Sequence, residues 1–177
     1  IIKFSELNVC VIGDLILDEY IYCQSIGMSH EDGSVVSTPL KKNYYLGGAG
    51  IVASHVKKLG SKCDFYSVLG NNKEAKIVKK FLSKSKINCN IFEDPGRLTT
   101  LKQRFKTINT NLLRLNTYST NEISLNIQDK IFKMFEKNVA KYDVVIFSDF
   151  NYGCLPQRLV EKIIKVSKKN NIKISKF

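Results

Sequence analysis

Two aspartates follow short apolar runs in this sequence, at positions where a carboxylate could bind a ligand. The run 9–12 ends in Gly13-Asp14, and the run 144–147 ends in Ser148-Asp149. Such runs predict buried parallel strands, and ligands bind outside the carboxyl ends of strands of this kind. An ionised carboxylate accepts two hydrogen bonds, so Asp14 is a candidate to bind neighbouring sugar hydroxyls or, alternatively, a turn or helix-cap residue. Asp18 either joins this site or only supports the turn.

The stretch 45–53, Tyr-Leu-Gly-Gly-Ala-Gly-Ile-Val-Ala, is a second candidate site. Its glycines let another molecule approach the backbone, and the helix predicted to follow leaves free N–H groups at its start. A plain turn, a sugar or polyol site and a dinucleotide site all stay open. Gly48, Gly50 and Ala53 have the spacing G-x-G-x-x-A of the dinucleotide fingerprint, but the next predicted strand carries no carboxylate at its end.

Two cations alternate on the strand predicted over residues 99–107. Lys102 and Arg104 are two positions apart, so their side chains face the same side of a strand. A fixed pair of cations on one face suits a phosphate group. Arg114, on the predicted partner strand 112–117, is placed to join them. The alternative is the ordinary alternation of polar residues on a solvent-facing strand.

Composition indicates one globular domain with a strong positive charge. The sequence has 177 residues, 44% of them hydrophobic and 25% charged, and a net charge of +12. The charge suits an anionic partner, but the lysines are scattered along predicted helix surfaces, which also fits a solvated basic surface. Aromatic residues are spread through predicted strands and helices rather than gathered into a base-stacking surface. We therefore expect a phosphorylated small molecule and no nucleic acid as the partner.

The cysteines indicate a reducing compartment. There are five, an odd number, and none of them forms C-x-x-C. They are expected to be small buried hydrophobic residues, not disulfides or zinc ligands. No apolar run is long enough to cross a membrane and no leader peptide is visible, so the expectation is a cytoplasmic protein with no membrane partner. No metal-binding motif is present, and we predict no metal ligand in the chain.

Strands and helices alternate along most of the chain, which predicts an α/β fold with a parallel sheet. Short β-rich runs at 19–23, 34–38 and 43–46 do not fit that alternation. Together with the predicted hairpin 99–117, they indicate a small extra sheet beside the core.

These pieces together resemble the ribokinase-like, phosphofructokinase-B-type carbohydrate kinases, and most closely the kinase domain that acts on D-glycero-D-manno-heptose 7-phosphate. The matching motifs occur in the family's order over nearly the whole chain. They are Val11-Ile12-Gly13-Asp14 with Asp18, Leu46-Gly47-Gly48-Ala49, Thr99-Thr100 with Lys102 and Arg104, Leu113-Arg114-Leu115, and Ser148-Asp149-Phe150 with Gly153.

The resemblance implies a ribokinase-like αβα core with a β lid, and ATP with Mg²⁺ as cofactors. It makes residues 1–177 the N-terminal part of a sugar kinase domain, with lid strands at about 19–46 and 99–117 and with the C-terminal nucleotide-binding half missing. It implies a homodimer formed through the lid. The substrate-binding residues would be Asp14, Asp18, Gly47, Gly48, Lys102, Arg104 and Asp149.

The sequence departs from the family pattern in three places. Ile51 stands where the family usually has an Asn that contacts substrate, and the heptose branch often has Lys near Tyr152. Gly48-Ala49-Gly50 is followed by Ile51, so it is not the family's catalytic Gly-Ala-Gly-Asp. We therefore predict a sugar or sugar-phosphate kinase with no catalytic residue in these 177 residues, inactive as it stands. The alternatives are a non-catalytic sugar-phosphate-binding or dimerising module and a dinucleotide-binding domain.

Overall fold

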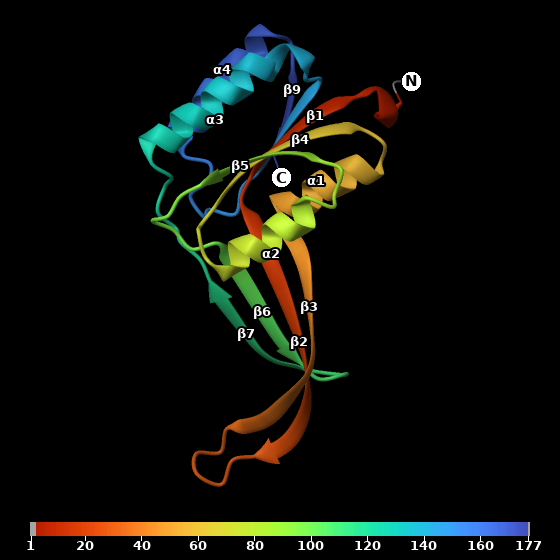
Figure 1. The fold of residues 1–177 in the computed structure, drawn as a ribbon, viewed down its shortest axis with the longest axis vertical. Coiled ribbons are helices and arrows are strands. Elements are labelled where there is room, and N and C mark those ends of the chain that lie inside the picture. Colours follow the sequence, from red (N-terminus) through yellow and green to blue (C-terminus); the bar gives the residue numbers. More distant parts are fainter. Residues whose placement is uncertain (1–2, 177) are drawn as a thin grey trace.

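The structure is a computed structural model that describes residues 3–176, and it contains a five-stranded parallel sheet at its centre (Figure 1). The strand order is β5-β4-β1-β8-β9, and every neighbouring pair is parallel. The strands span β1 (Asn8–Gly13), β4 (Lys62–Leu69), β5 (Asn88–Glu93), β8 (Val144–Ser148) and β9 (Lys173–Lys176). The predicted α/β class is confirmed.

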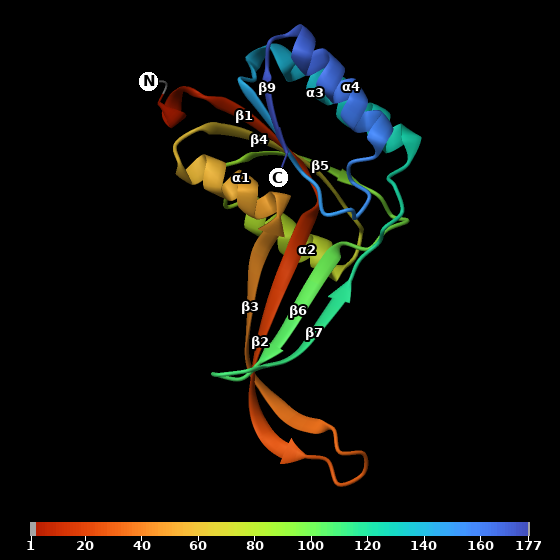
Figure 2. The same cartoon turned by 180° about the vertical axis from the view of Figure 1, so that it is seen from behind.

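Four helices cover the two faces of this sheet (Figures 1 and 2). They are α1 (Ala49–Lys58) and α2 (Lys73–Leu82) on one face, and α3 (Leu125–Asn138) and α4 (Gln157–Lys169) on the other. Two single-turn 3₁₀ helices, Phe4–Glu6 and Val139–Lys141, precede β1 and β8. No helix in residues 3–176 has the length and apolar character needed to cross a membrane.

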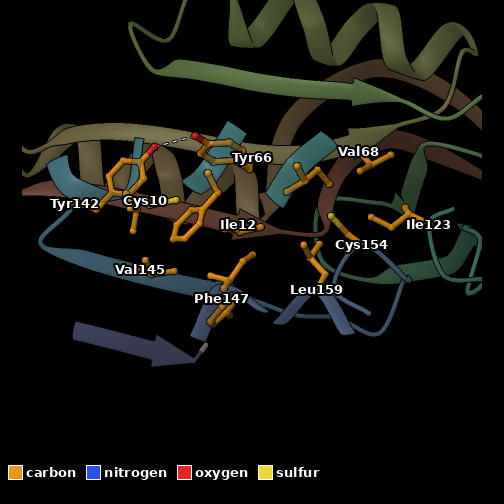
Figure 3. Packing of buried hydrophobic residues seen from close by; sticks show 14 of the residues in the cluster. Cys10, Ile12, Tyr66, Val68, Ile123, Tyr142, Val145, Phe147, Cys154 and Leu159 are labelled. Atoms are coloured by element: carbon orange, nitrogen blue, oxygen red, sulfur yellow. Dashed lines mark hydrogen bonds between the residues drawn. The ribbon is translucent and has the colours of Figure 1, made fainter. Parts of the chain in front are cut away.

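Alternate residues of the central strands enter different cores, because side chains point to opposite faces of a strand. On β1, Val9 and Val11 pack under α1 and α2, whereas Cys10 and Ile12 pack under α3 and α4. Figure 3 shows the second core, which contains the hydrogen-bonded hydroxyls of Tyr66 and Tyr142, 2.9 Å apart. All five cysteines are free, and four are buried.

The lid is a separate four-stranded sheet with the order β3-β2-β6-β7. Its strands are β2 (Leu15–Met28), β3 (Val35–Gly48), β6 (Thr100–Lys106) and β7 (Asn111–Thr117). The hairpin of β2 and β3 projects well beyond β6 and β7 (Figures 1 and 2). The extra sheet and its second hairpin were thus predicted correctly.

The prediction of several short strands between residues 19 and 46 was wrong. Both β2 and β3 have 14 residues and pair along their length. Register shifts between Tyr22 and Cys23 and between Ser25 and Gly27 absorb the irregular sequence. Pro39 lies in β3, which is an edge strand of this sheet. An edge strand has a neighbouring strand on one side only, so the missing N–H of a proline is tolerated there.

The two faces of the lid differ in character. The Asp18 face carries, on neighbouring strands, Asp18, Tyr20, Tyr22, Tyr45, Lys102, Arg104, Lys106 and Arg114. The Glu19 face carries Leu17, Glu19, Ile21, Tyr44, Leu101, Gln103, Phe105, Leu113 and Leu115. Tyr20 and Tyr22 thus lie on the Asp18 face, whereas Tyr44 lies on the Glu19 face, because Tyr44 pairs across from Glu19 and not from Asp18.

Candidate functional site

The two predicted aspartates lie side by side at the point where the strand order of the central sheet reverses. From β1 the chain builds β4 and β5 on one side, then crosses to place β8 and β9 on the other. Gly13 pairs with Ser148 at the carboxyl ends of β1 and β8, and the backbone N–H of Asp14 donates to the Ser148 carbonyl at 3.0 Å. Such a switch point is where open α/β sheets bind ligands.

The carboxylate of Asp14 holds the loop that follows β8. One oxygen accepts from the backbone N–H groups of Phe150, at 2.8 Å, and Tyr152, at 3.3 Å, and the other accepts from Cys154 at 3.2 Å. The residue is only 3% exposed, and burial raises its pKa although the three N–H donors oppose that shift. The anticipated turn function is therefore present. Sugar binding by Asp14 stays a prediction.

The glycine turn lies directly against this aspartate. Gly48 has φ +55, and a side chain there would collide with the Asp14 carbonyl, which accepts from Ala49 N–H at 2.9 Å. A Cβ on Gly47 would collide with the Asp18 carboxylate. Both glycines are therefore needed for close approach, and Gly48 also for its backbone conformation.

The dinucleotide interpretation of this turn is wrong. The strand that leads into Gly48 is β3, an antiparallel strand at the edge of the lid. The fingerprint belongs after the first strand of a parallel βαβ unit, and here that strand is β1, which leads into the lid instead.

Asp18 and Arg104 form an ion pair on the Asp18 face. This carboxylate raises the pKa of the Arg104 guanidinium, which also lies 5.1 Å from the centre of the Tyr20 ring. Arg114 is the residue directly opposite Arg104 on β7, and it is exposed. The predicted cation pair therefore shares one face, but its arginine already has a protein carboxylate as partner.

Lys102 has a different environment from Arg104. Its ammonium lies 5.6 Å from the centre of the Phe150 ring and 5.3 Å from that of Tyr152. Within residues 3–176 it forms no ion pair with Asp149 or any other carboxylate. It is half-buried, so it offers an anion a positive charge that no protein carboxylate neutralises.

Asp149 is half-buried at the head of the same loop, and one of its oxygens accepts from Asn151 N–H at 3.0 Å. Sequence reasoning assigned no binding role to Phe150, Tyr152 or Arg97, which lie around Lys102 or brace the loop. Two aromatic residues alternating directly after a strand-end aspartate are a signal that could have identified the rings.

In the described part of the chain, no three His, Cys, Asp or Glu side chains converge on a point that could hold a metal ion. Residues 3–176 therefore hold no magnesium site built from these protein side chains alone.

The fold is that of the ribokinase-like kinases. A carbohydrate kinase from Agrobacterium tumefaciens superposes with a TM-score of 0.68 at 13% identity, over 96% of this chain and 53% of that one. Ribokinase of Arabidopsis thaliana, solved in complex with ribose and ATP, superposes with a TM-score of 0.65 at 13% identity, over 96% and 53%.

The pfkB family carbohydrate kinase model matches residues 6–175, and the chain belongs to that family. The bifunctional protein HldE of Aliarcobacter butzleri is 34% identical over 168 residues, which cover 94% of this chain and 35% of that protein. The chain thus spans about a third of the length of the curated relatives it matches.

Proposed function

We propose that this chain is the acceptor side of a carbohydrate kinase that phosphorylates a hydroxyl of a sugar phosphate. Family membership supports the reaction class, and the surroundings of Lys102 support the phosphorylated substrate. The chain contributes groups that bind and orient the acceptor. ATP supplies the γ-phosphoryl group when bound, and positioning and charge stabilisation provide most of the catalysis in such transfers.

The observation that carries this proposal is the contrast between Lys102 and Arg104. Arg104 is paired with Asp18, so its charge is largely balanced within the lid. Among residues 3–176, the partners of the Lys102 ammonium are two aromatic rings, at 5.6 and 5.3 Å, beside the loop that begins at Asp149. A phosphate bound at the Lys102 ammonium would neutralise it and anchor the sugar at the switch point of the sheet.

Asp18, Gly47 and Gly48 fit the other end of such a substrate. The Gly47–Gly48 turn brings backbone close to Asp14 and Asp18, and α1 begins at Ala49 with no side chain capping its free N–H groups. Hydroxyl groups of a sugar can donate to the carboxylates and accept from N–H groups of this kind.

A heptose 7-phosphate, phosphorylated at its anomeric oxygen, is the proposed substrate because the motifs resemble that branch most closely. Tyr152 stands near the position where the branch often has a lysine. One cation of the branch pattern is therefore missing near this position, and the Tyr152 ring lies 5.3 Å from the Lys102 ammonium.

The test is a coupled ADP-release assay with Mg·ATP and a panel of heptose, hexose and pentose phosphates. We expect no turnover by the 177-residue chain, because the only Gly-Ala-Gly in the sequence lies at 48–50 and is followed by Ile51 and not Asp. We expect sugar-phosphate-dependent turnover by the full-length natural protein. Binding of sugar phosphate without turnover by that protein would favour the second function, a non-catalytic sugar-phosphate-binding module.

The family resemblance implies a dimer through the lid, and we also propose that the Glu19 face of the lid makes the contact with the second copy. Leu113 is 55% exposed there and Leu115 is 49% exposed. Beside them, Cys23, Val35 and Phe105 help to line a hollow of about 270 Å³. Exposed apolar surface of this kind marks interaction sites.

Sedimentation of the wild type should show a dimer that Leu113→Glu shifts to monomer. Leu59→Glu, at a residue 58% exposed just after α1, is the matched control and should leave the dimer intact. A wild type that is monomeric at high concentration would refute the pairing.

A further inference from the structure

The loop 149–154, which we call the aromatic loop, is braced by three other parts of the chain. Asp14, at the end of β1, accepts hydrogen bonds from three of its backbone N–H groups. Ile123, just before α3, donates its N–H to the Gly153 carbonyl at 3.0 Å. Arg97, in the connection between β5 and β6, donates its guanidinium to the Tyr152 carbonyl.

Arg97 links two segments that are far apart in the sequence. The Nη2 atom that bonds to Tyr152 also donates to the carbonyl of Asn121 at 3.3 Å. Its Nη1 atom is buried, and within residues 3–176 it has no hydrogen-bond partner. Arg97 therefore connects the aromatic loop to the segment before α3 through the carbonyls of Tyr152 and Asn121.

The backbone of the aromatic loop turns sharply at two left-handed positions. Asn151 has φ +60, a region that asparagine adopts more readily than most side chains, and Gly153 has φ +83, which glycine adopts freely. A Cβ on Gly153 would collide with the Asn121 carbonyl, the same group that Arg97 contacts. Close packing against Asn121 therefore restricts the path of this loop.

The aromatic loop places two rings beside each other, and a third ring lies next to them. The rings of Phe150 and Tyr152 are nearly parallel, at 18° with their centres 6.4 Å apart. Tyr118, which follows β7, lies 4.8 Å from the Tyr152 ring and is tilted against it by 34°. The Lys102 ammonium lies within reach of both Phe150 and Tyr152, at distances typical of cation–π contacts.

We propose that Arg97 is a positioning residue that fixes the aromatic loop so that Phe150 and Tyr152 hold the Lys102 ammonium ready for an anion. The inference rests on the proposed function in one respect, that the anion at Lys102 is a substrate phosphate. Rings hold an ammonium without neutralising it, whereas a carboxylate would compete with the phosphate. A preorganised lysine also loses less conformational freedom when the anion binds.

The first measurement is the NMR signal of the Lys102 ε-methylene group in the intact protein, assigned from its loss in Lys102→Arg. Ring currents should shift this signal away from that of a free lysine. Tyr152→Leu and Arg97→Ala should move it back, and Tyr152→Phe, which keeps the ring, should not. Lys106, on the same strand β6 as Lys102, lies 5.7 Å from the ring of Tyr22 on β2 and is the internal control, because its ring partner lies outside the aromatic loop. Its signal should stay unchanged.

The second measurement is a titration of the same signal with inorganic phosphate. Arg97→Ala and Tyr152→Leu should each weaken the apparent affinity by about three- to tenfold, the scale of one cation–π contact. Arg97→Lys keeps a donor toward the Tyr152 carbonyl and should restore part of the loss.

An Arg97→Ala variant that lowers the melting temperature but leaves the Lys102 signal and its phosphate affinity unchanged would overturn the proposal, since Arg97 would then be only structural. A free-lysine signal in the wild type would overturn it as well. A wild-type signal that is ring-shifted but does not respond to phosphate would instead contradict the proposed function.

Discussion

Asp18 on β2 and Arg104 on β6 form an ion pair between residues 86 positions apart in the chain. Their side chains are 18% and 26% exposed, so water screens the pair only in part. The pair ties together the two central strands of the lid, and its carboxylate also lies against Gly47. Lys102, two residues before Arg104, is thereby left as the unpaired cation of the two.

A double-mutant cycle tests how strongly Asp18 and Arg104 stabilise each other. Asp18→Asn and Arg104→Gln should each destabilise the chain, and their coupling should be about 0.5–1.5 kcal/mol, because the pair is partly buried. Urea denaturation of the two single variants and the double variant gives the coupling directly. A coupling near zero would mean that Arg104 is free to bind substrate and that its pairing in the structure has no energetic weight.

Gly48→Ala should be among the most destabilising small substitutions in the chain. Its backbone has φ +55, and a Cβ would collide with the Asp14 carbonyl. Gly33→Ala is the matched control, since Gly33 has φ +69 but nothing lies within 4 Å of the added Cβ.

The control should lose about 1 kcal/mol, from strain alone, and Gly48→Ala at least about 2 kcal/mol more. Equal losses in chemical denaturation would show that crowding at the turn is not important.

Asp14→Ala should cost more stability than Asp149→Ala. Removing the Asp14 carboxylate leaves three loop N–H groups without their acceptor in a buried place, whereas Asp149 accepts only one, from Asn151. We expect a loss of about 2–4 kcal/mol for Asp14 and less than about 1 kcal/mol for Asp149. Denaturant titrations give the unfolding free energies of both variants. An equal loss would mean that the Asp14 carboxylate does not stabilise the loop 149–154.

Stability should fall in acid through Asp64, far from the proposed site. Burial acts to raise the pKa of this carboxyl, but Lys141, Tyr142 and Asn88 outweigh burial and lower the pKa below its usual value. The folded chain therefore binds this proton less tightly than the unfolded chain. The stabilisation is present above about pH 4 and is lost as the pH falls through the lowered pKa of the folded state.

Asp64→Asn should flatten this part of the profile of unfolding free energy against pH. Asp14 titrates in the opposite sense, because its pKa is raised, but it is present in both proteins and cancels in the difference. Parallel profiles for the wild type and the variant would contradict the assignment.

Much of the fold could be predicted from the sequence because its strands are strongly patterned. The runs that end at Asp14 and Asp149 are apolar throughout, and only a strand covered on both faces needs that pattern. The long β2–β3 hairpin was missed because polar residues and Pro39 in an exposed edge strand look like turns when read locally.

The candidate site was harder to predict, because its key contacts are long-range. Sequence spacing placed Lys102 and Arg104 on one face, but only the three-dimensional pairing with Asp18 and with the Phe150 and Tyr152 rings distinguishes their surroundings. The contact of Arg97 could not be predicted either. Nothing in the sequence around Arg97 indicates that its guanidinium donates to the carbonyl of Tyr152.

The most direct test of the central claim is a calorimetric comparison of a sugar phosphate with the same sugar lacking its phosphate. The panel covers heptose 7-phosphates, hexose 6-phosphates and pentose 5-phosphates. Each is measured with the wild type, with Lys102→Gln and with Arg114→Gln, which removes an exposed arginine and is the control. The account predicts that the wild type binds a phosphorylated sugar more tightly than its parent sugar. Lys102→Gln should abolish most of that difference, about tenfold or more in affinity, and Arg114→Gln should keep it. Equal affinity for both members of every pair, or a phosphate preference that survives Lys102→Gln, would contradict the account.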